Sequence, residues 1–380
     1  MKRSVPPRCA CWPERSFSFG LFGALARPKP QSWFSLLAHC WPPVAVDVVK
    51  RHHLPVRVLY PNLGAEEDDG PPQPNPPAHL AMLSSAWQRS LLTADRLGFH
   101  TDGFVAWLNT PRAKRTAEAQ GLTLWGPDPV VVREVHDKGF CAHAVDRLGI
   151  LEAPLHGAIT VLDVEDCTVD NLVACTLQQP QWMSREGLVA KARMSTSGRG
   201  RLDLRRGITE RAAAKLRRRG GVVVEPWLPR VGDYSSQWWI DDDGVIRFLG
   251  ATKATQSFAG LWSGARMWID DDGIPTIPGQ VGKDVVDRGH MIVREAAAAG
   301  HRGPCGVDVF TWTDVDGAVW TRVCELNARM TGGIVAVLLA RQHLLEGKAG
   351  PGALVAYADG TVTTVSTTAA STFRSQALPE

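Results

Sequence analysis

The residues that decide the fold lie in two stretches, Gly306-Val-Asp308-Val-Phe310 and Cys324-Glu325-Leu-Asn327-Ala-Arg329-Met-Thr331-Gly332-Gly333. Between them stands Asp316-Gly317, and an Asp-Gly pair between two apolar runs is typical of a hairpin turn. We therefore predict that residues 307–312 and 319–326 pair as the two arms of an antiparallel hairpin.

Polar side chains of this hairpin are expected to converge. A register that sets Asp308 opposite Glu325 places two carboxylates side by side, and Asn327 shares their face because side chains alternate along a strand. Mg²⁺ binds a few such oxygens and completes its shell with water and phosphate. We predict Asp308, Glu325 and Asn327 as ligands of Mg²⁺, with Mn²⁺ as the alternative, and Arg329 as a catalytic residue that neutralises a transferring phosphoryl group. The alternative is a set of solvated polar positions, but the following Thr331-Gly-Gly favours a site.

The composition is that of a folded globular protein, with 380 residues, 44% hydrophobic and 21% charged. A formal net charge of +3 is too small to indicate nucleic-acid binding. No apolar run reaches the roughly 18–20 residues of a membrane helix. The eight cysteines contain no C-x-x-C pair, and a reduced cytoplasmic chain is the simplest account. We therefore expect no nucleic acid and no membrane as partner.

Composition and pattern divide the chain into four parts. Residues 1–53 mix aromatic residues, prolines and cations, and we expect a disordered extension or a misplaced start site rather than a signal peptide. Residues 54–125 alternate strands with helices, which favours a parallel sheet. Residues 126–345 form the main domain, and residues 346–380 a C-terminal hairpin and tail with its turn at Asp359-Gly360.

The spacing of apolar residues and the Gly and Pro punctuation predict the individual elements. Predicted strands other than the two hairpin arms lie at 55–60, 103–108, 122–125, 158–163, 188–192, 221–225, 235–240 and 245–249. Predicted helices lie at 79–97, 111–120, 129–148 and 208–219.

The hairpin motif resembles the metal-binding end of the ATP-grasp superfamily, and the other signatures of that superfamily have counterparts in the right order. The resemblance covers residues 126–333, preceded by the α/β domain of residues 54–125. It implies an α/β fold with α+β character in the ATP-grasp part. An N-terminal parallel-sheet domain is followed by two α+β subdomains, of which the smaller, the lid, spans about residues 150–228.

The resemblance also implies which residues hold ATP. Lys138, in His136-Asp-Lys138-Gly, would contact phosphate, and Lys191, at the end of a strand, would bind phosphate and act in catalysis. A small-residue loop would close over the phosphates, since backbone N–H groups bind anions. The run from residue 222 to 228 resembles the hinge that reads adenine. The remaining expected nucleotide-binding residues are Ser195, Thr196, Ser197, Gly198, Gly200, Glu225, Trp227, Leu228 and Asp233. Taken alone, the Asp-Lys pair is more typical of a surface lysine, and a basic surface turn is the alternative to the phosphate loop.

The activity that the resemblance implies is an ADP-forming ligase, in which ATP converts a carboxylate to an acylphosphate that an amine then attacks. The expected substrates are small molecules, an amino acid or a peptide. Thr331, Gly332 and Gly333 are expected to face the substrate carboxylate, and Arg266 to contribute to specificity. A homodimer is compatible with the sequence. Two alternatives stay open: a phosphotransferase with a hydroxyl acceptor, and a non-catalytic nucleotide-binding module. P-loop, G-x-G-x-x-G, G-x-S-x-G and H-E-x-x-H motifs are absent.

The loop gives a first testable prediction. If residues 195–201 close over the phosphates, the free protein should be cleaved after Arg199 or Arg201, because a small-residue loop with few apolar contacts opens at little free-energy cost. A non-hydrolysable ATP analogue with Mg²⁺ should slow this cleavage, and Lys191→Ala should weaken the protection. Limited trypsin digestion read by mass spectrometry measures both rates. An analogue that binds without changing cleavage at these two bonds contradicts the assignment.

Overall fold

The computed structural model describes residues 57–63, 65, 78–99, 101–178, 187–195, 200–256 and 262–365. All of them belong to one compact unit, Pro55–Glu380, and the structural statements below concern these residues. The predicted extension of residues 1–53 lies outside them, as do Thr196, Ser197 and Gly198 of the predicted phosphate loop.

The first elements form a small parallel sheet with two helices. They are β1 (Arg57–Tyr60), α3 (Ala78–Arg96), β2 (Gly103–Ala106) and α4 (Pro111–Glu118), and β1 pairs with β2 in parallel as predicted. The third predicted strand, 122–125, was wrong in extent, because it shrinks to one bridge between Leu124 and Phe104. The side chain of Asn109 donates to the carbonyls of Trp125 and Pro127, at 2.8 and 2.9 Å, and so turns the chain away from β2.

The predicted helix 129–148 is also wrong, because it is two helices, α5 (Pro129–His136) and α6 (Lys138–Arg147). Asp137 separates them with an extended backbone, ψ 128°, and its carboxylate accepts the N–H of Gly139 at 2.7 Å. An Asp that can cap a new helix competes with continuation of the old one. The break sets Lys138 at the first position of α6.

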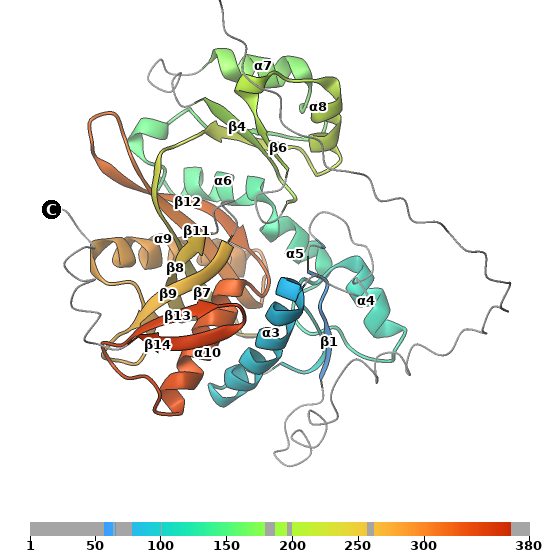
Figure 1. The fold of residues 1–380 in the computed structure, drawn as a ribbon. Helices are drawn as coiled ribbons and strands as arrows, with labels where there is room; N and C mark the ends of the chain where they lie inside the picture. The colour runs from blue at the N-terminus through green and yellow to red at the C-terminus, as the bar shows by residue number, and fades with distance from the viewer. Residues whose placement is uncertain are drawn as a thin grey trace, which may run out of the picture. The chain divides into compact units, whose positions relative to one another are not determined.

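The second part, called the lid here, is a four-stranded antiparallel sheet with two helices (Figure 1). The sheet has the order β3-β6-β4-β5, and a separate apolar core that includes Leu172, Leu188 and Leu216 lies between it and the helices. The elements are β3 (Thr160–Leu162), α7 (Val169–Leu177), β4 (Leu188–Ala192), β5 (Arg201–Asp203), α8 (Glu210–Arg217) and β6 (Val222–Pro226).

The third part, called the body, is a large antiparallel sheet of order β12-β11-β7-β8-β9-β13-β14, with β10 paired to β9. Two of its hairpins turn at the predicted sites Asp316-Gly317 and Asp359-Gly360, and in the second of them Asp359 and Gly360 both have positive φ, 48° and 76°, as a tight hairpin turn requires. The strands are β7 (Arg230–Ile240), β8 (Ile246–Gln256), β9 (Trp262–Ile269), β10 (Pro275–Thr276), β11 (Gly303–Thr313), β12 (Val319–Asn327), β13 (Leu354–Ala358) and β14 (Thr361–Val365).

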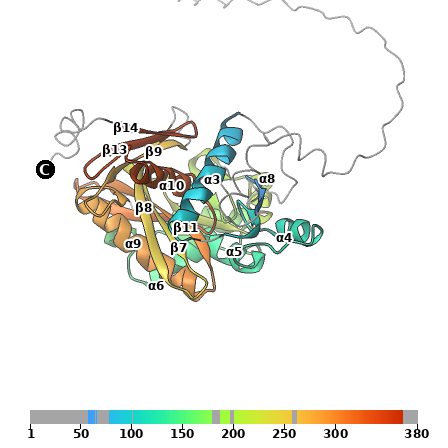
Figure 2. The same cartoon turned by 90° about the horizontal axis from the view of Figure 1, so that it is seen from below.

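Helices α9 (Gly279–Ala298) and α10 (Gly332–Leu345) pack on the body sheet. Residues 334–340 of α10 are all buried, as expected of a helix that is apolar on every side and enclosed by its neighbours. One of those neighbours is α3, which lies beside α10 in both views (Figure 2). The predicted class is therefore confirmed: a parallel α/β part precedes two α+β parts. None of the helices in the described ranges combines the length and apolarity needed to cross a membrane.

Two lid glycines give a matched stability test. Gly221 and Gly207 both have positive φ, 95° and 87°, which costs an L-residue about 1–2 kcal/mol. A Cβ on Gly221 would also lie 2.3 Å from the carbonyl oxygen of Leu162, whereas one on Gly207 would meet nothing within 4 Å.

We predict that Gly221→Ala lowers the free energy of unfolding by clearly more than Gly207→Ala, because only the former must displace β3. Thermal and urea unfolding followed by circular dichroism measure the difference. Equal losses in the two variants would contradict the close approach of β3 and β6.

Candidate functional site

One irregularity in β12 decides which side chains reach the site. Asp308 lies opposite Glu325, in the predicted register, but Val309 lies opposite Val323, so Cys324 is an extra residue in β12. Such a β-bulge places two consecutive residues against one partner. Cys324 and Glu325 consequently contact groups on the same side of the sheet, and the other members of that face are Arg322 and Asn327.

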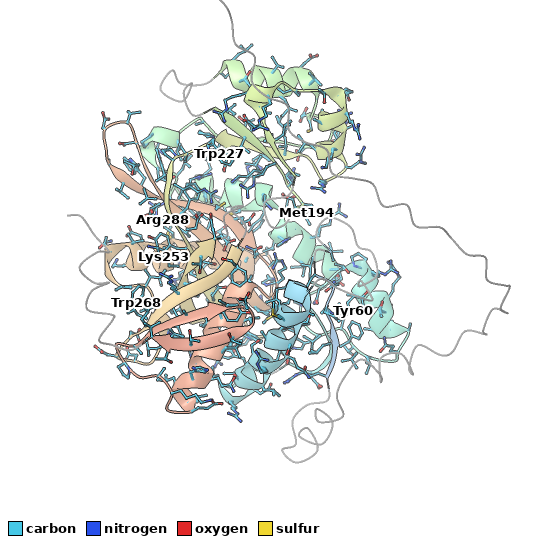
Figure 3. The ribbon with its side chains drawn as sticks, in the orientation of Figure 1. Tyr60, Met194, Trp227, Lys253, Trp268 and Arg288 are labelled. Carbon is cyan, nitrogen blue, oxygen red and sulfur yellow. The ribbon has the colours of Figure 1, made fainter. Side chains whose placement is uncertain are left out.

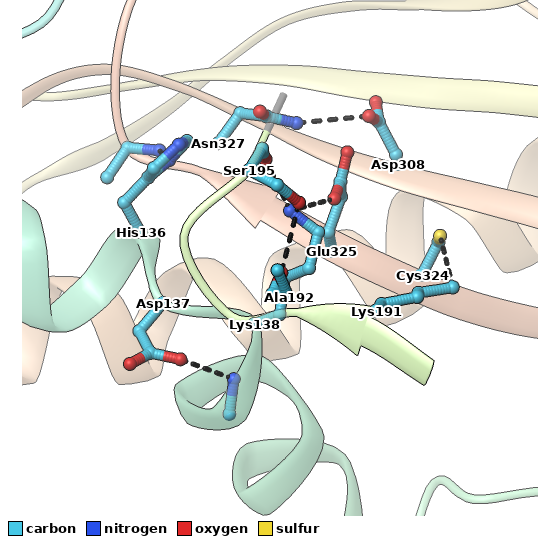
Figure 4. A network of polar contacts seen from close by, with 12 residues as sticks. His136, Asp137, Lys138, Lys191, Ala192, Ser195, Asp308, Cys324, Glu325 and Asn327 are labelled. Atoms are coloured by element: carbon cyan, nitrogen blue, oxygen red, sulfur yellow. Dashed lines mark hydrogen bonds and ion pairs between the residues drawn. The ribbon is translucent and has the colours of Figure 1, made fainter. Parts of the chain in front are cut away.

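The predicted metal ligands lie together on this face (Figure 4). The Nδ2 of Asn327 donates to Oδ2 of Asp308 at 3.0 Å. Burial, and then the negative charge of Glu325, raise the pKa of Asp308. A cation between the two carboxylates would remove that repulsion, and a turn of the Asn327 amide would present its oxygen.

These residues fit Mg²⁺. The described residues contain no group of three or more His, Cys, Asp and Glu side chains able to hold a metal ion. A cation here would therefore take two carboxylates and an amide oxygen, and leave positions for water and phosphate. Mg²⁺ binds in this way, with few protein ligands.

Lys138 stands beside the carboxylates. Its Nζ lies 2.9 Å from Oε2 of Glu325 and donates to the carbonyl of Ser195 at 2.6 Å. Burial would raise the pKa of Glu325, but the ammonium of Lys138 and the charge of Lys191 together hold it below its usual range. Lys138 thus joins the body hairpin to the start of the predicted phosphate loop.

Lys191 comes from the lid strand β4 and lies beside the same face of β12. Its ammonium is paired with Oε1 of Glu225 and lies 3.6 Å from Sγ of Cys324. Only 9% of the Lys191 side chain is exposed, so water screens its charge little and its attraction for a neighbouring anion is strong. The structure therefore brings both predicted lysines to the carboxylate face.

One pocket is lined by the polar residues Lys138, Lys191, Glu225, Arg322 and Cys324. It is also lined by the apolar residues Val145, Val223 and Val323. A pocket lined by both cations and branched apolar side chains suits a ligand that has both an apolar ring and anionic groups.

Next to this pocket, hydrogen bonds join the residue that follows β4 to the residues between α5 and α6. Arg193 donates from Nε to both carboxylate oxygens of Asp137, at 2.8 and 2.9 Å, and its carbonyl accepts the N–H of Lys138 at 3.3 Å. His136 is buried, and its Nδ1 accepts the N–H of Ala328 at 3.2 Å. Burial, with the charges of Arg329 and Lys138, lowers the pKa of His136 well below its usual value, so the ring is neutral.

The predicted hinge follows β6. The N–H of Trp227 donates to the carbonyl of Gly187 at 3.0 Å, and its side chain is 46% exposed (Figure 3). Leu228 is buried against Leu155 and Phe310. The carboxylate of Glu225 is paired with Lys191 and lines the pocket.

Asp233 lies at the rim of the site. It accepts from Arg230 at 2.5 Å and from Gln256 at 2.8 Å. The guanidinium carbon of Arg230 lies 4.0 Å from the ring centroid of Phe310, a cation–π contact that fixes the arginine.

The Thr331-Gly-Gly turn caps α10 and is joined to the strand β7. Thr331 Oγ1 accepts from the N–H of Ile334 at 3.0 Å and donates to Oε1 of Gln237 at 2.9 Å. Gln237 in turn donates to Ser235 at 2.7 Å, and Ser235, which lies opposite Asp308 in β11, donates to the carbonyl of Val307 at 3.2 Å.

No sequence motif indicated Ser235 or Gln237. Their spacing of two residues within a strand does predict that both side chains lie on one face of the sheet. The glycines of the turn are required by its close contacts. A Cβ on Gly333 would lie 2.3 Å from Nε2 of Gln237, and one on Gly332 would lie 2.6 Å from the ring of Trp262.

Arg266 lies away from the carboxylates. In the register of the sheet, Arg266 of β9 lies opposite Lys253 of β8, which Figure 3 labels. Lys253 lies opposite Tyr234 of β7, and Tyr234 lies opposite Val309 of β11. Directly opposed residues share a face and successive residues alternate, so Arg266 is on the face of Val309 and not on that of Asp308. Arg329, the predicted catalytic arginine, donates from Nη1 to the carbonyl of Met330 at 2.9 Å.

The structure thus brings Lys191 of the lid strand β4 and Lys138 of the helix α6 to paired carboxylates on the β11–β12 hairpin, which is the grouping that the motifs predict. No protein-family model matches the chain, and no curated protein matches it.

The fold is similar to solved enzymes. One is the biotin carboxylase domain of Hydrogenobacter thermophilus 2-oxoglutarate carboxylase, with 15% identity over 82% of this chain and 70% of that one and a TM-score of 0.49. Another is D-alanyl-alanine synthetase A from Vibrio cholerae, with 12% identity over 77% and 96% and a TM-score of 0.47. A third is an L-amino acid ligase from Bacillus licheniformis, with 16% identity over 83% and 76% and a TM-score of 0.42. These likenesses concern the fold alone, so the functional argument rests on the side chains described above.

Cys324 offers a direct probe of the pocket. It is partly exposed, whereas Cys141 in the same pocket is buried, and burial raises the pKa of that thiol to about 12. We predict that an ATP analogue with Mg²⁺ slows alkylation of Cys324 by iodoacetamide, because the bound molecule would cover the thiol.

The rate at Cys175, partly exposed on the lid helix α7, should stay unchanged and serves as the control. Mass spectrometry of the labelled peptides gives both rates. An analogue that binds while Cys324 reacts at the original rate lies in another place.

Proposed function

We propose that the protein is an ATP- and Mg²⁺-dependent ligase that joins a carboxylate to an amine. The observation that carries the proposal is the meeting of Lys138 and Lys191 with the face of Asp308 and Glu325. Cations of this kind hold phosphate groups, and the paired carboxylates suit the Mg²⁺ that accompanies a nucleotide.

The binding step uses the two lysines. Lys138 and Lys191 would exchange their present carboxylate partners for phosphate oxygens of ATP, and the valine wall of the pocket would take the adenine ring. Asp308, Glu325 and Asn327 would hold Mg²⁺, which neutralises charge on the phosphates when bound. The small-residue loop of residues 195–200 would close over the phosphates.

The chemical step needs mainly position and charge. The substrate carboxylate attacks the γ-phosphorus, the bond to the ADP oxygen breaks, and an acylphosphate forms. The amine then attacks the carbonyl carbon and phosphate leaves, with loss of a proton from the amine. Arg329 would face the acylphosphate, and the turn at Thr331 would present its main chain to the substrate carboxylate.

The substrate end of the proposal is supported by the connection from Thr331 through Gln237 and Ser235 to the carbonyl of Val307, the residue before Asp308. This chain of hydrogen bonds joins the α10 N-terminus to the strand that carries Asp308. An exposed indole, Trp262, lies against Gly332 and would form one wall for the substrate.

The reaction class can be tested directly. Purified protein with ATP and Mg²⁺ should release phosphate only when both an acid and an amine are present, and mass spectrometry of mixtures of amino acids and short peptides should find the condensed product. ADP formation with a hydroxyl compound, accompanied by its phosphorylated product and no amine requirement, would identify a phosphotransferase instead.

Glu325→Gln tests the metal site. The variant should keep the fold and lose turnover by a factor on the order of 10³, because a lost anionic ligand leaves transition-state charge on the phosphates less neutralised. Glu346→Gln is the matched control, since Glu346 also pairs with a lysine, Lys348, but lies after α10. Phosphate release and circular dichroism are measured for both. A folded Glu325→Gln enzyme with near-normal turnover would remove Glu325 from the site.

A further inference from the structure

One carboxylate in the pocket is shared by two cations from different parts of the fold. Oε1 of Glu225 is paired with Lys191 of the lid, and Oε2 accepts from Nη2 of Arg322, in the body strand β12, at 3.2 Å. All three side chains are nearly buried, with exposed fractions of 7%, 9% and 3% for Glu225, Lys191 and Arg322. The pairing is therefore made where water screens little.

Arg322 has a second carboxylate on its other side. Its Nη1 lies 3.9 Å from Oε2 of Glu152, and Oε1 of Glu152 lies 3.5 Å from Nη1 of Arg288. Burial raises the pKa of Glu152, an effect that the charge of Arg322 opposes. The planar, forked guanidinium suits this position between two carboxylates, which a lysine ammonium would match less well.

The charges of this cluster do not cancel. The ion pairs of Lys191, Arg322 and Arg288 in this cluster are with Glu225 and Glu152, so three cations share two carboxylates. Without Arg322, the carboxylate of Glu225 would have Lys191 as its ion-pair partner, and this neutral pair would attract a phosphate only weakly. With Arg322 present, Glu225 keeps one cationic partner when the Lys191 ammonium moves to a phosphate, so the free-energy cost of that exchange is lower.

We propose that Arg322 is a positioning residue for nucleotide binding: by holding Glu225 from the body side, it leaves the Lys191 ammonium able to bind an anionic oxygen of a nucleotide phosphate. The proposal rests on the proposed function of the site. In this role Arg322 acts through Glu225, although it also lines the pocket. The bulge at Cys324 is what puts Arg322 on this face, three residues before Glu325.

The main experiment measures the affinity of the full chain for a non-hydrolysable ATP analogue with Mg²⁺ by titration calorimetry. Arg322→Met should weaken binding by about tenfold or more, because Glu225 then competes with phosphate for Lys191. Arg288→Met is the matched control. It removes the other partner of Glu152 and leaves the Lys191–Glu225–Arg322 contacts in place, so binding should change by less than about twofold (Figure 3 labels Arg288).

A double variant separates positioning from general damage. In Arg322→Met with Glu225→Gln the competing charge is gone, and binding should return to within about threefold of the original chain. Loss of structure around a missing arginine would not be repaired by that second change. Arg322→Lys, which keeps the charge in a milder replacement, should weaken binding less than Arg322→Met and provides the measurement if the methionine variant does not fold.

A second readout does not depend on nucleotide. The thiol of Cys324 lies 3.6 Å from Nζ of Lys191, so its reaction with anionic iodoacetate relative to neutral iodoacetamide reports the local positive charge. Arg322→Met should lower this ratio several-fold, Arg288→Met should change it little, and Glu225→Gln in the Arg322→Met background should restore it.

Near-original affinity in a folded Arg322→Met variant overturns the proposal, as does a double variant that stays as weak as the single one. If the original chain binds no nucleotide analogue, the proposed function fails. The alkylation ratio then decides the role of Arg322 by itself: an unchanged ratio in Arg322→Met means that Arg322 does not control the charge available at Lys191.

Discussion

The pairing of β11 with β12, and the single extra residue within it, is the constraint on which the site depends. Strict alternation would put Arg322 and Glu325 on opposite faces, since they are three residues apart. The bulge at Cys324 changes the parity, so Arg322 and Cys324 face the lid together with Glu325 and Asn327. One inserted residue thereby places the predicted metal ligands Glu325 and Asn327 on the same face of β12 as Arg322 and Cys324, which contact the lid.

Ion pairs connect the lid to the body near this pocket, since Lys191 of the lid and Arg322 of the body share Glu225. Next to them Lys138 of α6 reaches Glu325, and Arg322 reaches Glu152, which precedes β3. Removing one partner of a buried pair is costly, because it leaves an unpaired buried charge. Under the proposed function, phosphate would replace a carboxylate as the partner of each lysine and so keep its charge paired.

Apolar packing holds in place the strands that carry these charges. Helix α10 is buried along residues 334–340, and its N-terminal turn is bound through Gln237 and Ser235 to the strand beside Asp308. The glycines at 332 and 333 allow that approach, since a side chain at either would overlap Trp262 or Gln237. The Thr331-Gly-Gly turn is therefore held beside β7 by the hydrogen bond from Thr331 to Gln237 and by the packing of α10.

The sequence by itself determined the hairpins that have Asp-Gly turns and many of the other elements, because Asp-Gly turns and apolar alternation act over a few residues. It also determined that Asp308 faces Glu325. Only the tertiary structure decided the break at Asp137, the loss of the strand at 122–125, and the face of Arg266, since these depend on a cap, a distant Asn109 and the order of strands in the sheet. Arg322 and Cys324 belong to the site for the same reason: a bulge is a property of the paired strands, and the partners of Arg322 lie 97 and 170 positions away in the chain.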